Sequence, residues 1–595
     1  MDERGVTQTG AQVALSRLLL TLFGAIAALA LWGLSDNWDN GGVSPSLSLA
    51  SFTFVGVYAA VVLAVAGPVS PVRALAGALV LAVPVTLLVS WAGLRHGVAT
   101  EFLDDPVMLV AVGVLLLLAT PFLLIGLRDP ARWLDYGALF SAAWGIVARY
   151  VMAGCFVGMV WLLLLLSDTL LRLVEIQTIG KLIATDWAPF VLSGAMLGLA
   201  MATLYELRGR FSPFLMLRLL RLMLPPVLAV LAIFVLAVPF QGLGKAFGDY
   251  SLAATLLVAV GVAITLISAA VDRDDRRSEI PRIISLSARG LALLLPVPAG
   301  LALGAVVLRV GQYGWTPDRI LAMTAAVVAV IYAMGYMFSV LRRPGWKGRI
   351  RRVNTGLAGL VLLVSALWLT PLFNVYRMST ESQLARFEDG QTPLEGLALW
   401  EMAHDWGKAG QDGLQRLEAM QDRPDHDALM AAIAVAREER NRFQAEQARR
   451  EQATPVLAER LAARLAVRPE GQPALAAGQL AGFPFYKLDQ WLSGCDIGTG
   501  DGRVGCVFLW APLLPGETRQ GAILYREIPD RTRIEFLAWP DGQPPVIREM
   551  HEAGQGGWPV LGAGLIGQVL DGGYSIDPAD LRALSLGGLR LIPGN

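Results

Sequence analysis

The chain has 595 residues, of which 55% are hydrophobic and only 16% are charged, and its mean hydropathy is +0.53. Soluble proteins carry about 25% charged residues, so most of this chain is not suited to contact with water. The formal net charge is zero, which gives no indication of a nucleic-acid partner. The composition therefore favours a membrane protein whose first partner is the lipid bilayer.

Eleven apolar stretches have the length of membrane-spanning helices, which need about 20 mostly apolar residues. They lie near residues 18–34, 48–66, 74–92, 106–126, 150–171, 187–205, 222–240, 250–271, 290–308, 320–341 and 354–374. The first is short and contains Ala28-Leu29-Ala30, a pattern similar to a signal-peptide cleavage site. Because Asp2 and Glu3 dilute the positive charge before it, we expect an uncleaved helix.

Residues 134–149 are apolar but interrupted, and they end at Arg149. We interpret them as a helix that lies at the cytoplasmic surface of the membrane before the fifth span. The alternative, a further span, would move the C-terminus to the other side of the membrane and turn the arginine-rich loops downstream outward.

Lysine and arginine concentrate in alternate loops, most densely near residues 273–289 and 342–352. The opposite loops hold few basic residues: Arg95, Arg172, Lys181, Lys245, Arg309 and Arg319. Since cytoplasmic loops are enriched in Lys and Arg, the N-terminus is predicted to be cytoplasmic. An odd number of spans then places the C-terminal part outside. Arginine, alanine and glycine richness is typical of a bacterial source, so we expect a bacterial inner membrane with a periplasmic C-terminal domain.

The predicted fold class is mainly α, a polytopic helical membrane domain followed by a small α+β domain. The expected divisions are a cytoplasmic N-terminus over 1–17, a transmembrane domain over 18–374, a helical extracytoplasmic segment over 375–480 and a β-rich subdomain over 481–595. In the last part Val507–Trp510, Ala522–Ile528, Arg533–Trp539 and Pro545–Met550 have strand composition and are separated by Gly, Pro and Asp, which favours a small antiparallel sheet.

Two of the three cysteines, Cys495 and Cys506, flank a glycine-rich loop. In an oxidising compartment a disulfide between them is expected. The loop is also similar to calcium-binding loops, but only Asp496, Thr499 and Asp501 offer side-chain oxygen, fewer than the six to eight oxygens that Ca²⁺ takes. We therefore expect a hairpin, with no metal and no cofactor.

Charged residues within or beside the predicted spans are candidates for function, because an ion in the bilayer is costly. Asp168 and Arg172 are four residues apart and can pair on one helix face, and Glu206 and Arg208 end the sixth span. A polar pathway through these residues is one hypothesis, and charges that reach the membrane surface are the other.

Glycine pairs spaced four apart allow helices to approach closely: Gly154/Gly158, Gly194/Gly198 and Gly300/Gly304. Prolines interrupt several spans, among them Pro296 and Pro298, and such breaks either line a polar pathway or are simple kinks. A lipid-linked glycosyltransferase would need acids in the outer loops, where Asp36, Asp39, Glu101, Asp104 and Asp105 lie, although the first loop is short for that class. No nucleotide-binding, zinc-protease or serine-hydrolase motif is present in the sequence.

The connection between the ninth and tenth spans reads Arg309-Val-Gly-Gln-Tyr-Gly-Trp-Thr-Pro-Asp-Arg319. It resembles the signature of a bacterial membrane family labelled domain of unknown function 4153, and the resembling residues are Arg309, Gln312, Tyr313, Gly314, Thr316 and Arg319. The resemblance covers most of residues 10–375 and implies a polytopic inner-membrane protein without implying an activity. Thr316 and Pro317 suit the start of a helix. The string is therefore predicted to be either a capped turn anchored to neighbouring residues or a site for an anion or lipid headgroup.

Three functional hypotheses remain. The first is a non-enzymatic envelope sensor or scaffold that presents its C-terminal domain to another envelope protein. The second is a transporter or channel with a polar cavity near Pro296/Pro298 or Asp168. The third is a membrane transferase that uses Asp36, Asp39 or Asp105.

Overall fold

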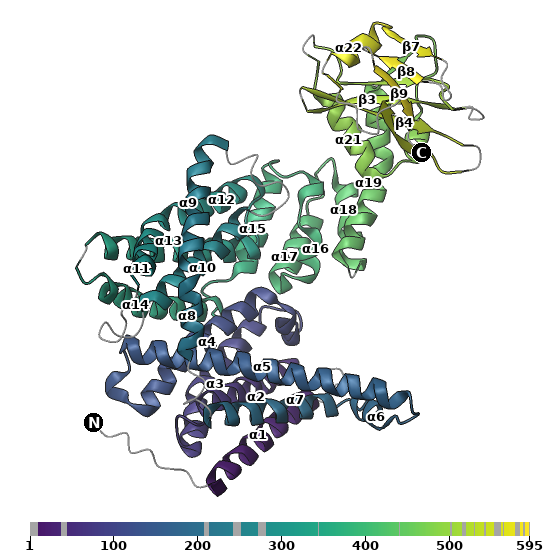
Figure 1. Ribbon diagram of the computed structural model, residues 1–595. Coiled ribbons are helices and arrows are strands. Elements are labelled where there is room, and N and C mark those ends of the chain that lie inside the picture. The colour runs from purple at the N-terminus through teal and green to yellow at the C-terminus, as the bar shows by residue number, and fades with distance from the viewer. Residues whose placement is uncertain are drawn as a thin grey trace. The chain divides into compact units, whose positions relative to one another are not determined.

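Eleven helices in the computed structural model are long and apolar enough to cross a membrane, counted over the described residues (Figure 1). All eleven coincide with the predicted spans, so the polytopic helical class is confirmed. The structure describes residues 10–36, 44–206, 213–241, 252–271, 281–342, 344–439, 441–499, 502–514, 519–528, 530–540, 543–552, 561–562, 564–577, 583–586 and 589–593.

The chain divides into two units, Met1–His426 and Asp427–Asn595. The helices of the first unit up to the predicted end of the membrane domain are α1 (Gly10–Asp36), α2 (Pro45–Val65), α3 (Pro71–Gly93), η1 (Ala99–Asp104), α4 (Pro106–Arg128), η2 (Pro130–Arg132), α5 (Tyr136–Arg172), α6 (Thr178–Ile183), α7 (Ala188–Glu206), α8 (Pro213–Leu222), α9 (Leu224–Gln241), α10 (Leu252–Val271), α11 (Arg282–Leu294), α12 (Pro296–Tyr313), α13 (Pro317–Leu341) and α14 (Trp346–Trp368).

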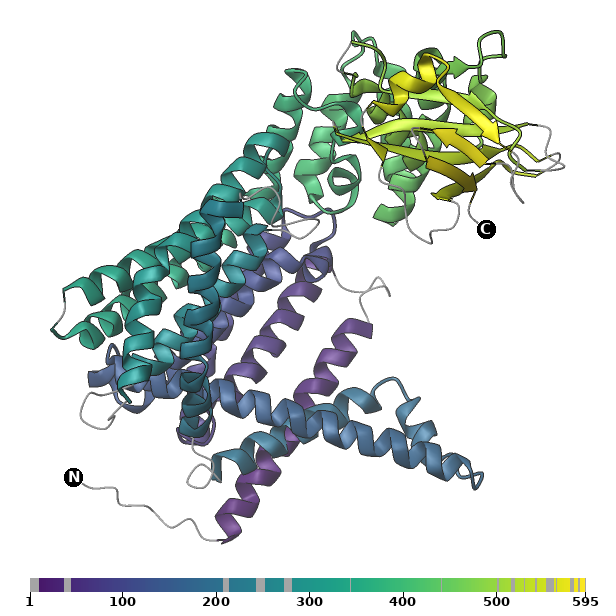
Figure 2. The ribbon, with the colours of Figure 1, turned by 45° about the horizontal axis from the view of Figure 1, so that its top comes forward.

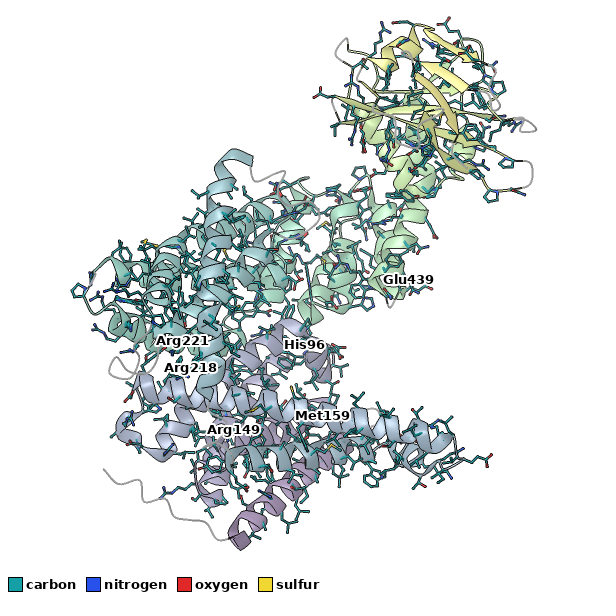
Figure 3. The ribbon with its side chains drawn as sticks, in the orientation of Figure 1. His96, Arg149, Met159, Arg218, Arg221 and Glu439 are labelled. Carbon is teal, nitrogen blue, oxygen red and sulfur yellow. A yellow bond between two sulfur atoms is a disulfide. The ribbon has the colours of Figure 1, made fainter. Side chains whose placement is uncertain are left out.

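Helix α5 is continuous over 37 residues. At 1.5 Å per residue it is about 55 Å long, well beyond the roughly 30 Å hydrocarbon core. The stretch 134–149 is therefore not a helix separate from the fifth span, because residues 136–149 form the first part of α5, and its position at the membrane surface stays a prediction. Arg149 does not end the helix: it is buried and donates to Ala64 O at 2.6 Å and Ala66 O at 3.4 Å at the end of α2 (Figure 3).

Helices α1 and α7 cross in close contact, and α5 packs on α7 (Figure 2). The glycines of the crossing leave no room for a side chain. A Cβ on Gly198 would lie 2.0 Å from Leu20 O, and one on Gly194 would lie 2.3 Å from Gly24 O. Of the three predicted glycine pairs only Gly194/Gly198 serves this purpose, since a Cβ on any of the other four glycines would meet nothing within 4 Å.

Arginines bind the C-terminal ends of several spanning helices. Arg221 donates to Ala269 O at 2.9 Å and Arg351 to Val271 O at 3.0 Å, both at the end of α10. Arg349 donates to Ser339 O at 2.9 Å near the end of α13. The last carbonyl groups of a helix have no hydrogen-bond partner within it and carry partial negative charge. A guanidinium group donates hydrogen bonds to these carbonyl groups and its positive charge offsets theirs.

The break between α11 and α12 falls at Leu295, just before Pro296. Helices α11 and α12 together form one apolar stretch of 32 residues, interrupted at this break. Leu291, Leu295 and Ala299 around the break are fully buried in an apolar cluster. The break is therefore packed as a kink, and these side chains give it no polar lining.

The first unit continues past the last span with α15 (Val375–Glu388), η4 (Leu394–Gly396), α16 (Leu399–His404) and α17 (Gly407–Glu418). Helix α17 contacts both α15 and α16 (Figure 1). The division between units at residue 426 thus falls inside the predicted segment 375–480. Helix α17 packs closely on α16, because a Cβ on Gly410 would lie 2.1 Å from Met402 O. These three helices fold together with the spanning helices.

The second unit is α+β. Its helices are α18 (His426–Glu438), which starts at the division, α19 (Arg442–Arg464), α20 (Ala477–Leu480), α21 (Phe485–Asp496) and α22 (Leu565–Leu570). Its strands are β1 (Ala466–Arg468), β2 (Cys506–Trp510), β3 (Gln520–Ile528), β4 (Arg531–Ala538), β5 (Val546–Glu552), β6 (Leu561–Gly562), β7 (Tyr574–Asp577), β8 (Ala583–Leu586) and β9 (Leu589–Pro593).

The nine described strands form one sheet in the order β1-β2-β3-β4-β5-β9-β8-β7, with β6 paired to β4. The four predicted strands correspond to β2–β5. The expected small antiparallel sheet is larger than predicted and mixed, because β1 runs parallel to β2. Helices α19 and α21 cover one apolar side of this sheet, where Trp491, Phe508 and Tyr525 are fully buried.

Candidate functional site: the α15 junction

The turn between α12 and α13 places the residues of the family-like string. Thr316 is the N-cap of α13, accepting from Arg319 N at 3.4 Å, and Pro317 follows at the first helical position. Gly314 has φ +74° and ψ −178°, a backbone conformation open essentially to glycine alone. The predicted capped turn is therefore present, and its shape depends on Gly314.

Side chains of α15 bind the backbone of this turn with five hydrogen bonds. Gln383 Nε2 donates to Tyr313 O at 3.0 Å and to Trp315 O at 3.1 Å. Arg386 donates to Gly311 O at 3.1 Å and to Gln312 O at 2.7 Å, and Ser382 Oγ accepts from Trp315 N at 3.0 Å. A net hydrogen bond contributes about 1 kcal/mol, and one to a charged group more. We call this contact, together with the α3–α4 connection below, the α15 junction.

The arginines of the string surround one ring. The guanidinium carbons of Arg309 and Arg319 lie 5.6 and 5.4 Å from the centre of the Tyr313 ring. Arg319 also donates to Tyr313 O at 3.0 Å and Gly314 O at 2.8 Å. Arg319 is thus engaged in holding the turn, and Tyr313, half exposed, separates the two positive charges.

The connection between α3 and α4 forms the other half of the junction. Arg95 donates to Trp368 O at 3.0 Å and to Thr370 O, which ties the connection to the end of α14. Lys408 at the start of α17 donates from Nζ to Leu94 O and from its backbone N to Arg95 O, both at 2.9 Å. The first helices after the last span are thus held to two separate turns of the spanning bundle.

A buried acid and a buried base face each other beneath α15. His96, labelled in Figure 3, is 4% exposed. The Asp105 side chain is 10% exposed, and His96 Nε2 lies 4.0 Å from Asp105 Oδ2. Asp105 Oδ1 caps α4 through Val107 N and Met108 N, whereas its Oδ2 and His96 Nε2 have no hydrogen-bond partner among the described residues. The Tyr376 ring of α15 packs on the His96 ring at 5.6 Å, and the Tyr376 hydroxyl is likewise unbonded there.

Burial shifts both groups away from their charged forms. It lowers the pKa of His96 to about 4, and the positive charge of Arg95 adds to this effect. It raises the pKa of Asp105 to about 6; the hydrogen bonds from Met108 and Val107 oppose the rise, and the carboxylates of Asp405 and Asp318 add to it. Sequence reasoning considered Asp105 only as a transferase acid and gave His96 no role.

The predicted intramembrane pair Asp168–Arg172 forms, with Arg172 Nε donating to Asp168 Oδ2 at 2.7 Å. Asp168 is buried at the end of α5, where its carboxylate lies against Gly180 of α6, while Arg172 is 62% exposed. Glu206 instead pairs with Arg17 of α1 at 2.5 Å. Arg208 and Asp39 lie outside the described residues, and Asp36 ends α1.

In the second unit Cys495 and Cys506 form a disulfide with a Cα–Cα distance of 4.6 Å, as predicted. It joins the last turn of α21 to the start of β2. Asp496 pairs with Arg464, and the Thr499 hydroxyl donates to Arg503 O at 3.0 Å. Asp501 lies outside the described residues. Within the described ranges, no group of three or more His, Cys, Asp or Glu side chains could hold a metal ion.

One buried network escaped the sequence analysis. Glu535 of β4 is 3% exposed and accepts from Lys487 Nζ at 2.7 Å, Trp491 Nε1 at 3.0 Å and Tyr525 Oη at 3.1 Å. The bonds from Lys487 and Trp491 fasten α21 to the sheet, and the bond from Tyr525 joins β3 to β4. Because the carboxylate is bonded to a cation and two further donors, we interpret the network as structural.

The fold and the junction define a multi-pass membrane protein in which helices α15, α16 and α17 follow the last span, and an α+β unit follows them in the chain. No protein-family model, no curated protein and no solved structure matches the chain.

Proposed function

We propose that the chain is a non-enzymatic envelope protein of a bacterial inner membrane, with a cytoplasmic N-terminus, that presents its C-terminal unit on the periplasmic side as a sensor or scaffold. The observation that carries the proposal is the α15 junction. Ser382, Gln383 and Arg386 all bind the backbone of the α12–α13 turn, so their polar groups fix a helix rather than await a ligand.

Two further features support the orientation. The basic residues are concentrated in alternate loops, and an odd number of spans, such as the eleven among the described residues, would place the two chain ends on opposite sides. The disulfide of the second unit suits an oxidising compartment such as the periplasm. The orientation is tested with Arg377→Cys, at an exposed position of α15, in a Cys155→Ser background. An impermeant thiol reagent should label it in intact spheroplasts; labelling only after lysis would reverse the assignment.

The transporter hypothesis receives less support. Its expected polar cavity near Pro296 and Pro298 meets an apolar cluster instead. Asp168 is already paired with Arg172 on the same helix. The transferase hypothesis assigned catalysis to Asp105, but this carboxylate caps α4 and is buried beneath α15.

The scaffold proposal is tested by photo-cross-linking from unit 2 in the producing host, with quantitative mass spectrometry of the products. The triple variant Ser382→Ala/Gln383→Ala/Arg386→Ala removes the side chains that hold α15, and Arg377→Ala on the exposed face of α15 is the matched control. We expect a stoichiometric protein partner with the wild type and the control, and a several-fold loss with the triple variant. A defined lipid or small molecule in place of a protein would contradict the proposal and favour transport.

A further inference from the structure

We propose that His96 and Asp105 form a binding site for one proton, held between His96 Nε2 and Asp105 Oδ2, and that the presence of both residues keeps the docking of α15 nearly independent of pH over the acidic-to-neutral range. The inference rests on the proposed role of α15 as the fixed base of the presented unit. It adds a ligand, the proton, and a residue pair that hold this base in place.

The geometry fits a shared proton. The two atoms face each other at 4.0 Å, and neither has another hydrogen-bond partner among the described residues. A hydrogen bond between nitrogen and oxygen has a length of about 2.7–3.2 Å, so an approach of about 1 Å closes one. A single proton would satisfy both atoms at once and would leave the pair without net charge, which a buried site favours.

Among the described residues, the positive charge nearest in effect is that of Arg95, which interacts electrostatically with both Asp105 and His96. Arg95 from the same connection donates to the end of α14, and Lys408 of α17 donates to Leu94 O. Asp318 of α13 and Asp405 after α16 act on Asp105 only through their charge, which favours proton binding. Phe102 and Tyr376 cover the His96 ring at centroid distances of 6.1 and 5.6 Å and exclude water from it.

Burial shifts the pKa values of the two groups in opposite directions, so the two groups alone would give docking opposite dependences on pH. Alone, Asp105 would favour docking below its ordinary pKa of 3.8, and this contribution would be lost as the pH rises through about 6. Alone, His96 would favour docking above its ordinary pKa of 6.5, and this contribution would be lost as the pH falls through about 4.

When both residues are present, these two opposite pH dependences of docking largely cancel. The shifted pKa values place the first proton of the docked pair near pH 6 and the second near pH 4. If undocking of α15 exposes both groups, these values lie close to their ordinary pKa values of 6.5 and 3.8. Docking therefore changes which residue holds the proton and hardly changes how many protons are bound. The consequence is a junction that tolerates pH changes in the compartment it faces, provided that both residues are present.

The test uses the full-length protein in phosphatidylcholine nanodiscs, without a partner protein. Hydrogen exchange of the α15 amides, corrected for the intrinsic pH dependence of exchange, reports docking between pH 4.5 and 7.5. The variants are Asp105→Asn, which retains a good N-cap, and His96→Gln. Asp104→Asn, an exposed acid one residue earlier, is the matched control.

We expect the wild type and the control to change protection by only about 3-fold over this pH range. Asp105→Asn should lose docking by up to about 70-fold as the pH falls, and His96→Gln by up to about 25-fold as the pH rises. In the double variant, the protection of the α15 amides should not change with pH. A wild type that varies more than about 10-fold, or single variants that stay flat while retaining the Cys495–Cys506 disulfide and a monodisperse elution profile, would overturn the proposal.

Infrared titration of the wild type provides a measurement that needs no variant. We expect the C=O stretch of one protonated carboxyl group to appear as the pH falls through about 6. If no carboxyl group titrates between about pH 5 and 7, the proposal fails. Because neither measurement involves a partner, an unsuccessful cross-linking experiment would leave this result standing, and the reverse also holds.

Discussion

Replacing Gly314 by alanine should detach α15 from the α12–α13 turn. A non-glycine residue at φ +74° and ψ −178° costs about 1–3 kcal/mol. The new Cβ would also lie 2.7 Å from Arg386 Cδ, 3.0 Å from Gln383 Nε2 and 3.1 Å from Ser382 Oγ. All three side chains that form the five hydrogen bonds must therefore shift. With each net bond near 1 kcal/mol, we expect docking to weaken by at least about 2 kcal/mol, or roughly 30-fold.

Hydrogen exchange of the α15 amides in nanodiscs measures this loss. Gly304→Ala is the matched control, because it lies in the preceding helix and its Cβ would meet nothing within 4 Å. Alanine there should leave docking unchanged and favour α12 by about 0.5–1 kcal/mol. If Gly314→Ala protects α15 as well as the wild type does, then the backbone shape of the turn does not control docking and the argument from close contact is wrong.

Three further predictions concern other parts of the chain. Gly198→Ala should lower the thermal unfolding midpoint in detergent, because its Cβ would meet Leu20 O. Gly158→Ala, whose Cβ would lie in open space, should leave the midpoint unchanged, and equal midpoints for the two variants would exclude the close α1–α7 crossing. Cys495→Ser should destabilise unit 2 by about 3 kcal/mol in denaturant titrations, and alkylation of the unreduced wild type at this site would show that the disulfide does not form. Glu535→Ala should cost about 3–5 kcal/mol by removing the acceptor of Lys487, whose side chain is only 17% exposed, and of two buried donors. A loss below about 1 kcal/mol would mean that the network is hydrated.

The spanning helices could be predicted from sequence because their signal is local, a run of apolar residues of bilayer length. The continuity of α5 could not, since Arg149 looked like a boundary and its charge is satisfied by the carbonyl groups of α2, more than 80 residues earlier. The three glycine pairs carry the same local pattern, yet only Gly194/Gly198 meets another helix. Which pair does so depends on packing between distant segments, and one sequence does not contain that information.

The candidate site shows the same limit. The string from Arg309 to Arg319 marked the turn, and Thr316 marked the start of α13 correctly. Its partners, Gln383 and Arg386, lie some 70 residues later, within the stretch 375–480 that the sequence predicted only as a helical segment. The family resemblance and the membrane orientation stay predictions. The role proposed for His96 and Asp105 depends on the two side chains facing each other. That arrangement follows from the fold of the α3–α4 connection, which the sequence alone does not give.

The hydrogen bonds that hold α15 end on main-chain atoms of residues 311–315 rather than on side chains. Main-chain groups are the same in every residue other than proline, so most substitutions within the turn would leave these contacts intact. Evolutionary drift there should be constrained mainly at the glycine that sets the backbone path. Related chains could therefore keep the same docked helix while the amino-acid sequence of the turn changes at most positions other than this glycine.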